Sequence, residues 1–354
     1  MPDKMRDWVR LRKFQKTSEV WIKITTVDAH TAGEPFRIVV GGAPVFEGST
    51  VLARRSYAAE YADHIRRLIV NEPRGHADMY GGFVVPPNDP DADLGVVFFH
   101  KDGYSTACGH GTIALVTWAI ESGYLSGEGS HRRVVVDVPS GRLETEATVN
   151  ESGSVETVSF VNVPSYVSGW QIPVQLSDGV VGVDLAYGGA FYASIDASDV
   201  GLDVRPEHVH HFVAVAREVK GVLGRMSSVR HPVDDRLSGL YGTIFFEALD
   251  HCGRGWRQRN ITVFAEGEID RSPCGRGTSA RLAILDSTAE LARGEALVHE
   301  SVIGTEFTGR VIGDTEVAGV HAVVTKVRGS AYKTGEAAFV LDPDDPLGLG
   351  FQLR

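Results

Sequence analysis

The chain is poor in cysteine, in basic residues and in long apolar runs. Its 354 residues include three cysteines, too few for a disulfide framework, which indicates a reducing compartment. Lys and Arg number 35 against 46 Asp and Glu, and the resulting net charge of −11 argues against broad binding to nucleic acid or anionic membranes. No segment approaches the ~18 apolar residues that a membrane span requires. We therefore expect a cytoplasmic protein with no nucleic-acid or membrane partner.

The start of the chain lacks the apolar core of a signal peptide. Residues 1–20 carry scattered charges and are interpreted as a polar leader before the folded part. Glycine, in contrast, is abundant at 40 residues, which indicates tight turns or close approaches of backbone to ligand. A hydrophobic fraction of 43% with 23% charged residues is that of an ordinary globular protein.

Short β-like segments dominate the chain from residue 21 onward. LGVVFFH, RRVVVDV and ITVFA are rich in β-branched residues, whereas TVLARRSYAAEYADHIRRLIVNEP has the periodicity of one amphipathic helix. Many strands with few helices predict an α+β fold. We expect two halves: residues 21–190, joined by residues 340–354 returning to them, and residues 191–339.

One local pattern occurs twice. ACGHGTIA (107–114) and PCGRGTSA (273–280) share the frame Cys-Gly-x-Gly-Thr-x-Ala, and each follows a β-like segment and opens a helical one. A repeated frame in the same strand–turn–helix context predicts two related halves with a site between them, the first carrying Cys108 and the second Cys274. Cys252 lacks the Gly-Thr of the frame and is interpreted as a bystander.

A cysteine followed by glycines at a helix start combines two chemical properties. The first N–H groups of a helix lack partners and carry partial positive charge, and glycine lets a carboxylate approach them. The same field favours a thiolate, so we expect a lowered cysteine pKa. Two such starts facing each other would place one sulfur on either face of a carbon beside the bound carboxylate, an arrangement suited to moving protons at that carbon. This scheme requires no metal and no cofactor; the alternative is two buried, inert cysteines.

Several longer motifs resemble the proline racemase superfamily, in the same order along the chain from about Val27 to the C-terminus. They are DAHTAGEPFR, NEPRGHADMYGG, GYSTACGHGTIAL, DLAYGGAFYA, LYGTI and DRSPCGRGTSAR. The superfamily includes proline racemases, 4-hydroxyproline 2-epimerases and trans-3-hydroxy-L-proline dehydratases. The resemblance implies the fold of diaminopimelate epimerase, in which two pseudo-symmetric α/β halves each wrap a curved sheet around a central helix and the site lies in the cleft.

The resemblance also implies roles for individual residues. Cys108 and Cys274 take the positions of the two acid/base residues. The implied substrate-binding residues are Gly109, His110, Asp270, Gly275 and Arg276. Backbone amides at the two helix starts would hold the carboxylate, and the side chains of His110 and Asp270 would contact the ring amine. The Asp270 side chain could instead cap a turn. Arg276 stands where racemases usually have Thr, and it pairs with a substrate oxygen, narrows the pocket or points to solvent. A homodimer is expected from the family alone.

The sequence leaves the member reaction open. Two cysteines favour inversion of the α-carbon of proline or hydroxyproline, because inversion needs an acid and a base on opposite faces. In the dehydratases one position is usually Ser or Thr, yet HKDGYSTACGH, DLAYGGAFYA and DDPLGLGF are more like that branch. The alternative is therefore trans-3-hydroxy-L-proline dehydration, in which a cysteine removes the α-proton and the 3-hydroxyl leaves as water, giving pyrroline-2-carboxylate.

Two other classes of protein and one metal site are weaker interpretations. Cys108 and Cys274 could form a redox pair in a thiol–disulfide enzyme, or the cleft could bind an imino acid without catalysis. His208, His210 and His211 lack cysteines or carboxylates at ligand spacing, so we interpret them as the solvated start of a helix and expect no metal.

Overall fold

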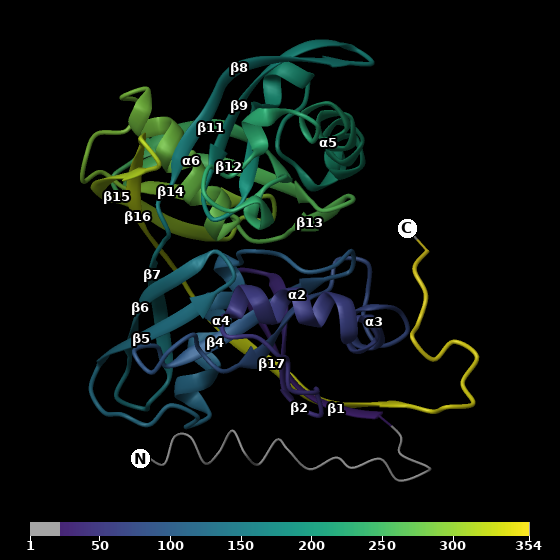
Figure 1. The fold of residues 1–354 in the computed structure, drawn as a ribbon. Helices are drawn as coiled ribbons and strands as arrows, with labels where there is room; N and C mark the ends of the chain where they lie inside the picture. Colours follow the sequence, from purple (N-terminus) through teal and green to yellow (C-terminus); the bar gives the residue numbers. More distant parts are fainter. Residues whose placement is uncertain (1–21, 354) are drawn as a thin grey trace.

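The computed structural model describes residues 22–353, and Figure 1 shows their arrangement. The leader expected in residues 1–20 lies outside the described residues, as does the side chain of Cys252. The described part has a mixed α/β structure. Its strands are β1 (Ile22–Thr31), β2 (Glu34–Gly41), β3 (Tyr80–Val85), β4 (Leu94–His100), β5 (His131–Val138), β6 (Gly141–Val149), β7 (Val155–Val161), β8 (Tyr166–Leu176), β9 (Gly179–Tyr187), β10 (Phe191–Asp196), β11 (Leu240–Cys252), β12 (Gly255–Phe264), β13 (Glu268–Asp270), β14 (Leu297–Ser301), β15 (Glu306–Val317), β16 (Val320–Gly329) and β17 (Ala331–Leu341). Its helices are α2 (Val51–Tyr61), α3 (Asp63–Val70), α4 (Gly109–Glu121), α5 (Val209–Leu223) and α6 (Gly275–Ser287), with short 3₁₀ turns η1 (Ala197–Val200), η2 (Pro206–His208), η3 (Ser227–Val229) and η4 (Asp235–Leu237).

The strands pair in two sets with the same topology. The first runs β17-β1-β2-β3-β4-β5-β6-β7, and the second runs β8-β9-β10-β11-β12-β14-β15-β16 with β13 added to β12. In each set the third and fifth pairs along these orders are parallel, namely β2–β3 and β4–β5 in the first and β10–β11 and β12–β14 in the second. Helices α4 and α6 follow the corresponding strands. The chain therefore consists of two repeats of one unit, joined where β16 pairs with β7.

The boundaries of these repeats differ from the expected ones. Residues 166–190 were expected in the first half, but β8 pairs with β9 and β9 pairs with β10 of the second. Residues 331–339 lie in β17, which pairs with β1 of the first half. From here on, the first half means residues 22–161 and 331–353, and the second half means residues 166–329. A period-two pattern identifies strands but not their partners, which is why the sequence misplaced these boundaries.

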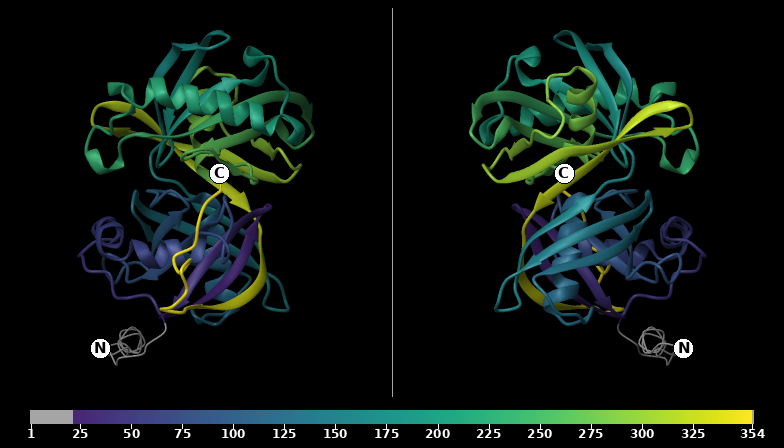
Figure 2. Two further views of the ribbon diagram at one scale, coloured as in Figure 1. Left: turned by 90° about the vertical axis from the view of Figure 1, so that its right-hand side faces the viewer. Right: turned by 90° about the vertical axis from the view of Figure 1, so that its left-hand side faces the viewer.

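The end of the chain lies against the first half, as the two side views in Figure 2 show. The side chain of Asn71 donates a hydrogen bond to the Leu349 carbonyl oxygen at 3.0 Å, and Glu72 and Phe351 form an isolated antiparallel bridge. The segment expected to be one helix is instead two helices, α2 and α3. The break falls at Ala62, whose backbone leaves the helical region.

Each half curves around one buried helix. Helix α4 packs against β1, β2, β7 and β17, which include both outer strands of the first set, and α6 packs likewise against β8, β9, β15 and β16. Almost all residues of α4 are buried, as are the first eleven of α6. A helix enclosed on every side matches the nearly all-round apolar composition of the segment after Cys108. The N-terminal ends of both helices lie where the two halves meet.

Candidate active site

The N-termini of the two central helices are in contact through one glycine of each helix. A Cβ atom added to Gly109, the first residue of α4, would lie 2.7 Å from the Cα atom of Gly275, and one added to Gly275 would lie 3.0 Å from the Cα atom of Gly109. Only glycine permits backbones to approach so closely. The first N–H groups of both helices therefore lie beside the same small volume.

The structure brings every expected site residue to that volume. A small cavity of about 10 Å³, room for about one water molecule, is lined by the expected residues Cys108, Gly109, His110, Asp270, Cys274, Gly275 and Arg276. Both sulfurs are free thiols, and the two cysteines come from opposite halves. The duplicated frame thus converges on one cavity, as the internal repeat predicted.

The second glycine and the threonine of the repeated frame have the same local function in both copies. The second glycine makes room for the sulfur, because a Cβ atom on Gly111 would lie 2.7 Å from Cys108 Sγ and one on Gly277 would lie 3.0 Å from Cys274 Sγ. The threonine of each copy donates its hydroxyl to the carbonyl oxygen of the cysteine, at 2.7 Å in the first copy and 3.0 Å in the second. The frame is therefore a device for holding a thiol at a helix start.

Burial dominates the electrostatics of both thiols. Cys108 is 4% and Cys274 6% exposed, and desolvation raises the pKa of each well above its usual value. The N–H of Gly111, which donates to Cys108 Sγ at 3.1 Å, and the charge of Arg276 lower the Cys108 pKa only in part. The expectation of lowered thiol pKa values is therefore wrong for this arrangement, because the field of a helix start does not offset the loss of water.

Asp270 serves both as a turn cap and as a cavity carboxylate. Its Oδ1 accepts hydrogen bonds from the backbone N–H of Ser272 at 2.8 Å and from the hydroxyl of Ser272 at 2.7 Å. Burial raises the pKa of Asp270 to about 6, and the Ser272 bonds act in the opposite direction. Asp270 also shares a hydrogen bond with Cys274. The group is mostly ionised at neutral pH and lies beside one of the two sulfurs.

His110 is a neutral imidazole packed between aromatic rings. Its ring lies edge-on to Tyr80, with 4.8 Å between centroids, and burial lowers its pKa to about 3. Both ring nitrogens lie 3.5 Å from Cys108 Sγ. His110 therefore presents a hydrogen-bonding group, and no positive charge, to the first cysteine.

Three tyrosines also line the cavity, and the sequence analysis did not single them out. They are Tyr80, Tyr192 and Tyr241. The Tyr80 and Tyr241 hydroxyls lie 3.1 Å apart, Tyr80 also contacts the hydroxyl of Ser105, and Cys274 Sγ lies 3.8 Å from the Tyr192 hydroxyl. Each tyrosine lies in a motif quoted for the resemblance, next to glycine or alanine. That placement was the available signal, but no spacing rule marks a tyrosine as a cavity residue.

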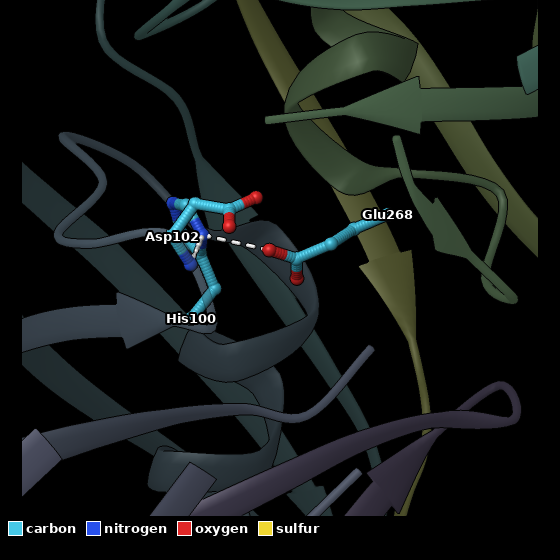
Figure 3. A group of neighbouring side chains, drawn as sticks. All are labelled: His100, Asp102 and Glu268. Atoms are coloured by element: carbon cyan, nitrogen blue, oxygen red, sulfur yellow. Dashed lines mark hydrogen bonds and ion pairs between the residues drawn. The ribbon is translucent and has the colours of Figure 1, made fainter. Parts of the chain in front are cut away.

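Within the described residues, one group has the geometry of a metal site. His100, Asp102 and Glu268 place ligand atoms within 4.8 Å of one another, and Figure 3 shows His100 facing Glu268 of the other half. His100 Nδ1 lies 3.0 Å from Glu268 Oε1, Asp102 pairs with Lys101 at 3.0 Å, and Asp102 also accepts the N–H of Glu266 at 3.1 Å. The His100–Glu268 and Asp102–Glu266 bonds join the two halves, so the group is a polar contact between them.

The histidines 208, 210 and 211 lie away from the cavity, at η2 and the start of α5. His208 Nδ1 lies 3.0 Å from the carbonyl oxygen of Asp203. Among residues 22–353 no helix has the length and apolar character needed to cross a membrane.

Fold and site together define a class of protein: a duplicated α/β unit with a cysteine at the start of each central helix and one cavity between the two. The chain belongs to the proline racemase family, whose model matches residues 26–352. It is 44% identical over 338 residues to a trans-3-hydroxy-L-proline dehydratase of Bacillus thuringiensis subsp. konkukian, covering 96% of this chain and 99% of the relative. It is equally 44% identical over 337 residues to a 3-hydroxyproline 2-epimerase of Burkholderia multivorans, covering 94% of this chain and 98% of the relative.

Solved structures agree with the family. A hydroxyproline epimerase from Agrobacterium vitis with bound trans-4-hydroxy-L-proline superposes with a TM-score of 0.87 at 29% identity, over 95% of this chain and 97% of that one. A more distant likeness, to a phenazine biosynthesis protein of the PhzF family from Bacillus anthracis, has a TM-score of 0.56 at 14% identity over 89% of this chain and 98% of that one, and concerns the fold alone.

Proposed function

We propose that this protein inverts the α-carbon of a hydroxyproline, 3-hydroxyproline in the first place, without a cofactor and with Cys108 and Cys274 as the two proton carriers. The observation that carries the proposal is the pair of free thiols from opposite halves in one small cavity. Inversion needs a base on one face of the carbon and an acid on the other. Relatives named for 3-hydroxyproline support the choice of substrate.

The remaining expected residues have complementary tasks in this proposal. The substrate carboxylate lies at the joint N-termini of α4 and α6, where the N–H groups of both helix starts stabilise negative charge. Asp270, ionised at neutral pH, pairs with the ring ammonium. One cysteine thiolate takes the α-proton, the electron pair stays on the carbon and its carboxylate, and the opposite thiol then donates its proton to the other face. Bound substrate also supplies an ammonium charge that favours a thiolate.

Dehydration of trans-3-hydroxy-L-proline is a second candidate, favoured by the names of several relatives. In that substrate the α-hydrogen and the 3-hydroxyl lie on the same face of the ring. A cysteine that has taken the α-proton therefore faces the departing oxygen. The C–H electron pair forms the new double bond, the C–O bond breaks, and the thiol returns its proton so that water leaves. One thiol suffices for this sequence, which leaves the second thiol unexplained.

Product identity separates these candidates. The wild-type protein would be incubated in D₂O with L-proline, trans-4-hydroxy-L-proline and trans-3-hydroxy-L-proline, with a chelator and no added cofactor, and followed by NMR. The proposal predicts an α-deuterated epimer of a hydroxyproline. Formation of a pyrroline carboxylate alone would replace inversion by dehydration, and an unchanged α-hydrogen in all three compounds would overturn both.

Separate assays of dithiol oxidation and of ligand affinity test the two distant classes. A thiol–disulfide enzyme would oxidise or reduce dithiols at a rate unrelated to α-hydrogen exchange. A binding protein would retain its ligand affinity without exchange. The diaminopimelate-epimerase type of fold and the homodimer belong to the same proposal and rest on family resemblance. The cytoplasmic location is also a proposal, and it rests on the low cysteine content.

A further inference from the structure

Arg276 is a buried cation without a protein partner. It is 1% exposed, and none of the described residues offers a hydrogen-bond partner to its Nε, Nη1 or Nη2 atom. Its guanidinium lies over the ring of Phe160, 5.5 Å from the ring centroid. An unpaired buried guanidinium is costly to keep, so a side chain of this kind in a cavity wall indicates that a ligand completes it.

The surrounding backbone is shaped to accept this side chain. A Cβ atom on Gly189 would lie 3.0 Å from Arg276 Nη1, and one on Gly188 would lie 2.5 Å from the Arg276 carbonyl oxygen. Both glycines belong to the sequence DLAYGGAFYA, and Gly189 has a φ of 101°, which disfavours other residues. The two glycines of that motif therefore leave room for the Arg276 side chain.

One other buried polar atom without a partner lies near the guanidinium, and the charge of Arg276 reaches a second. The Cβ atom added to Gly189, which would lie 3.0 Å from Arg276 Nη1, would also lie 3.4 Å from Ser140 Oγ. Ser140 Oγ and Tyr187 Oη are both buried and lack hydrogen-bond partners among the described residues, and the charge of Arg276 acts on the pKa of Tyr187. A hydroxyl ligand suits such a set, because it accepts from a guanidinium and donates to an oxygen.

The division of charge within the cavity indicates which group of the substrate Arg276 meets. The helix starts at Gly109 and Gly275 offer their N–H groups to a carboxylate, and Asp270 offers its charge to an ammonium. The polar group of a hydroxyproline that remains is the oxygen on its ring. We propose that Arg276 binds this hydroxyl oxygen and makes the site selective for hydroxylated over unsubstituted proline. This rests on the proposed function.

The same contact bears on both candidate reactions. During inversion the hydroxyl oxygen stays bound to Arg276, which therefore contributes to substrate binding. During dehydration the C–O bond breaks and negative charge develops on the oxygen, where a guanidinium stabilises it until a thiol proton completes the water molecule. Arg276 is thus a specificity-determining residue in either case.

Selectivity in binding tests the inference without depending on turnover. Dissociation constants of trans-3-hydroxy-L-proline and L-proline would be measured by calorimetry for wild type, Arg276→Met and Arg276→Lys. Wild type should prefer the hydroxylated compound, and Arg276→Met should lose about tenfold to a hundredfold of that preference, the range for a hydrogen bond to a charged group. Arg276→Lys, which keeps the charge but not the planar group, should lie between.

Arg281 supplies a matched control on the same helix. It is also buried, but its guanidinium lies 3.6 Å from the centroid of the Phe246 ring and its Nε donates to Gln258, and it does not line the cavity. Arg281→Met should change stability and leave the ratio of the two constants unchanged. The inference would be overturned if Arg276→Met left the ratio of the two dissociation constants unchanged. It would also be overturned if wild type showed no preference for the hydroxylated compound. Failure of the proposed function is distinct, since wild type would then exchange no α-hydrogen whatever its binding preference.

Discussion

At the scale of single residues, the two cysteines occupy unequal environments despite their identical frames. A glycine N–H lowers the pKa of each thiol and the charge of Asp270 raises both, but the charge of Arg276 lowers only the pKa of Cys108. Cys274 shares a hydrogen bond with Asp270, whose negative charge disfavours its thiolate. Cys274 also has a φ of 63°, a strained backbone for a residue other than glycine. In the proposed mechanism these differences favour Cys108 as the base and Cys274 as the acid.

Replacing either sulfur should stop inversion. Cys108→Ser and Cys274→Ser should each reduce the rate of epimer formation at least about a hundredfold, because a serine hydroxyl is a poor proton carrier near neutral pH. Chiral chromatography of the products measures this rate. Near-normal inversion by either variant would contradict the two-thiol assignment, and retention of water loss by Cys274→Ser alone would support dehydration.

The raised pKa of Asp270 predicts an acid limb in the pH profile. Binding of the ring ammonium needs the carboxylate, and burial raises the pKa of this group to about 6. Since protonation removes the charge, kcat/KM should lose one further factor of ten per pH unit well below pH 6, compared with the slope above pH 6, where only the thiol base still titrates. Asp270→Asn should show a low kcat/KM without this limb. A flat profile between pH 4.5 and about 7 in wild type would contradict the role of Asp270.

At the scale of elements, the site depends on two helices meeting at their first residues. Gly109→Ala would place a methyl group 2.7 Å from Gly275 Cα, so the helices must move apart. We expect a loss of about 1–3 kcal/mol in unfolding free energy and a larger loss of activity, since the thiols move with the helices. Urea unfolding and exchange rates measure both.

Gly221→Ala is the control for this change. Gly221 lies in α5 and a Cβ atom there would have open space. Alanine at this position should stabilise the protein by about 0.5–1 kcal/mol through helix propensity. A Gly109→Ala protein as stable and active as Gly221→Ala would refute the glycine contact.

The elements also show what could be predicted from the sequence. The repeated Cys-Gly-x-Gly-Thr-x-Ala frame located both central helix starts and six of the seven expected cavity residues, because its glycines and threonine have local physical functions. Asp270 lies outside the frame and was expected only from the resemblance. The prediction of a single helix before Pro73 was wrong, because the helix breaks at Ala62. Nothing in that alanine-rich helical stretch indicates a bend. Tyr80, Tyr192 and Tyr241 were missed because tertiary packing, and no local pattern, brings them to the cavity.

At the scale of the whole molecule, a seam of buried charge holds the halves together beside Asp270. The backbone N–H of Arg271 donates to Glu34 at 2.7 Å, and the Arg271 guanidinium pairs with Asp78 at 2.8 Å. Glu34 and Asp78 belong to the first half, and both carboxylates are buried.

Strand pairing across the molecule could not be predicted from the sequence, because strands with similar hydrophobic patterns do not indicate which strand each pairs with. Two boundaries between the halves were therefore misplaced, one by the length of β8 and β9 and one by residues 331–339 of β17.

Removing the cation from this seam should weaken the whole fold. Arg271→Ala leaves two buried carboxyl groups beside each other, and we expect a loss of about 3 kcal/mol in unfolding free energy. The exposed pair of Lys326 with Glu146 also joins the halves, at 2.9 Å, so Lys326→Ala is the control and should cost at most about 1 kcal/mol. Equal costs in urea unfolding would show that the seam is no stronger than a surface pair.

The central claim is that two thiols act on opposite faces of one carbon. Early samples from a reaction of unlabelled trans-3-hydroxy-L-proline in D₂O test it most directly, with the α-hydrogen content of substrate and product epimer measured by mass spectrometry. We predict a product that carries deuterium from the first turnovers while the remaining substrate keeps its hydrogen, since each face has its own proton carrier. A product epimer that retains the substrate's own hydrogen would show a single carrier and would contradict the account.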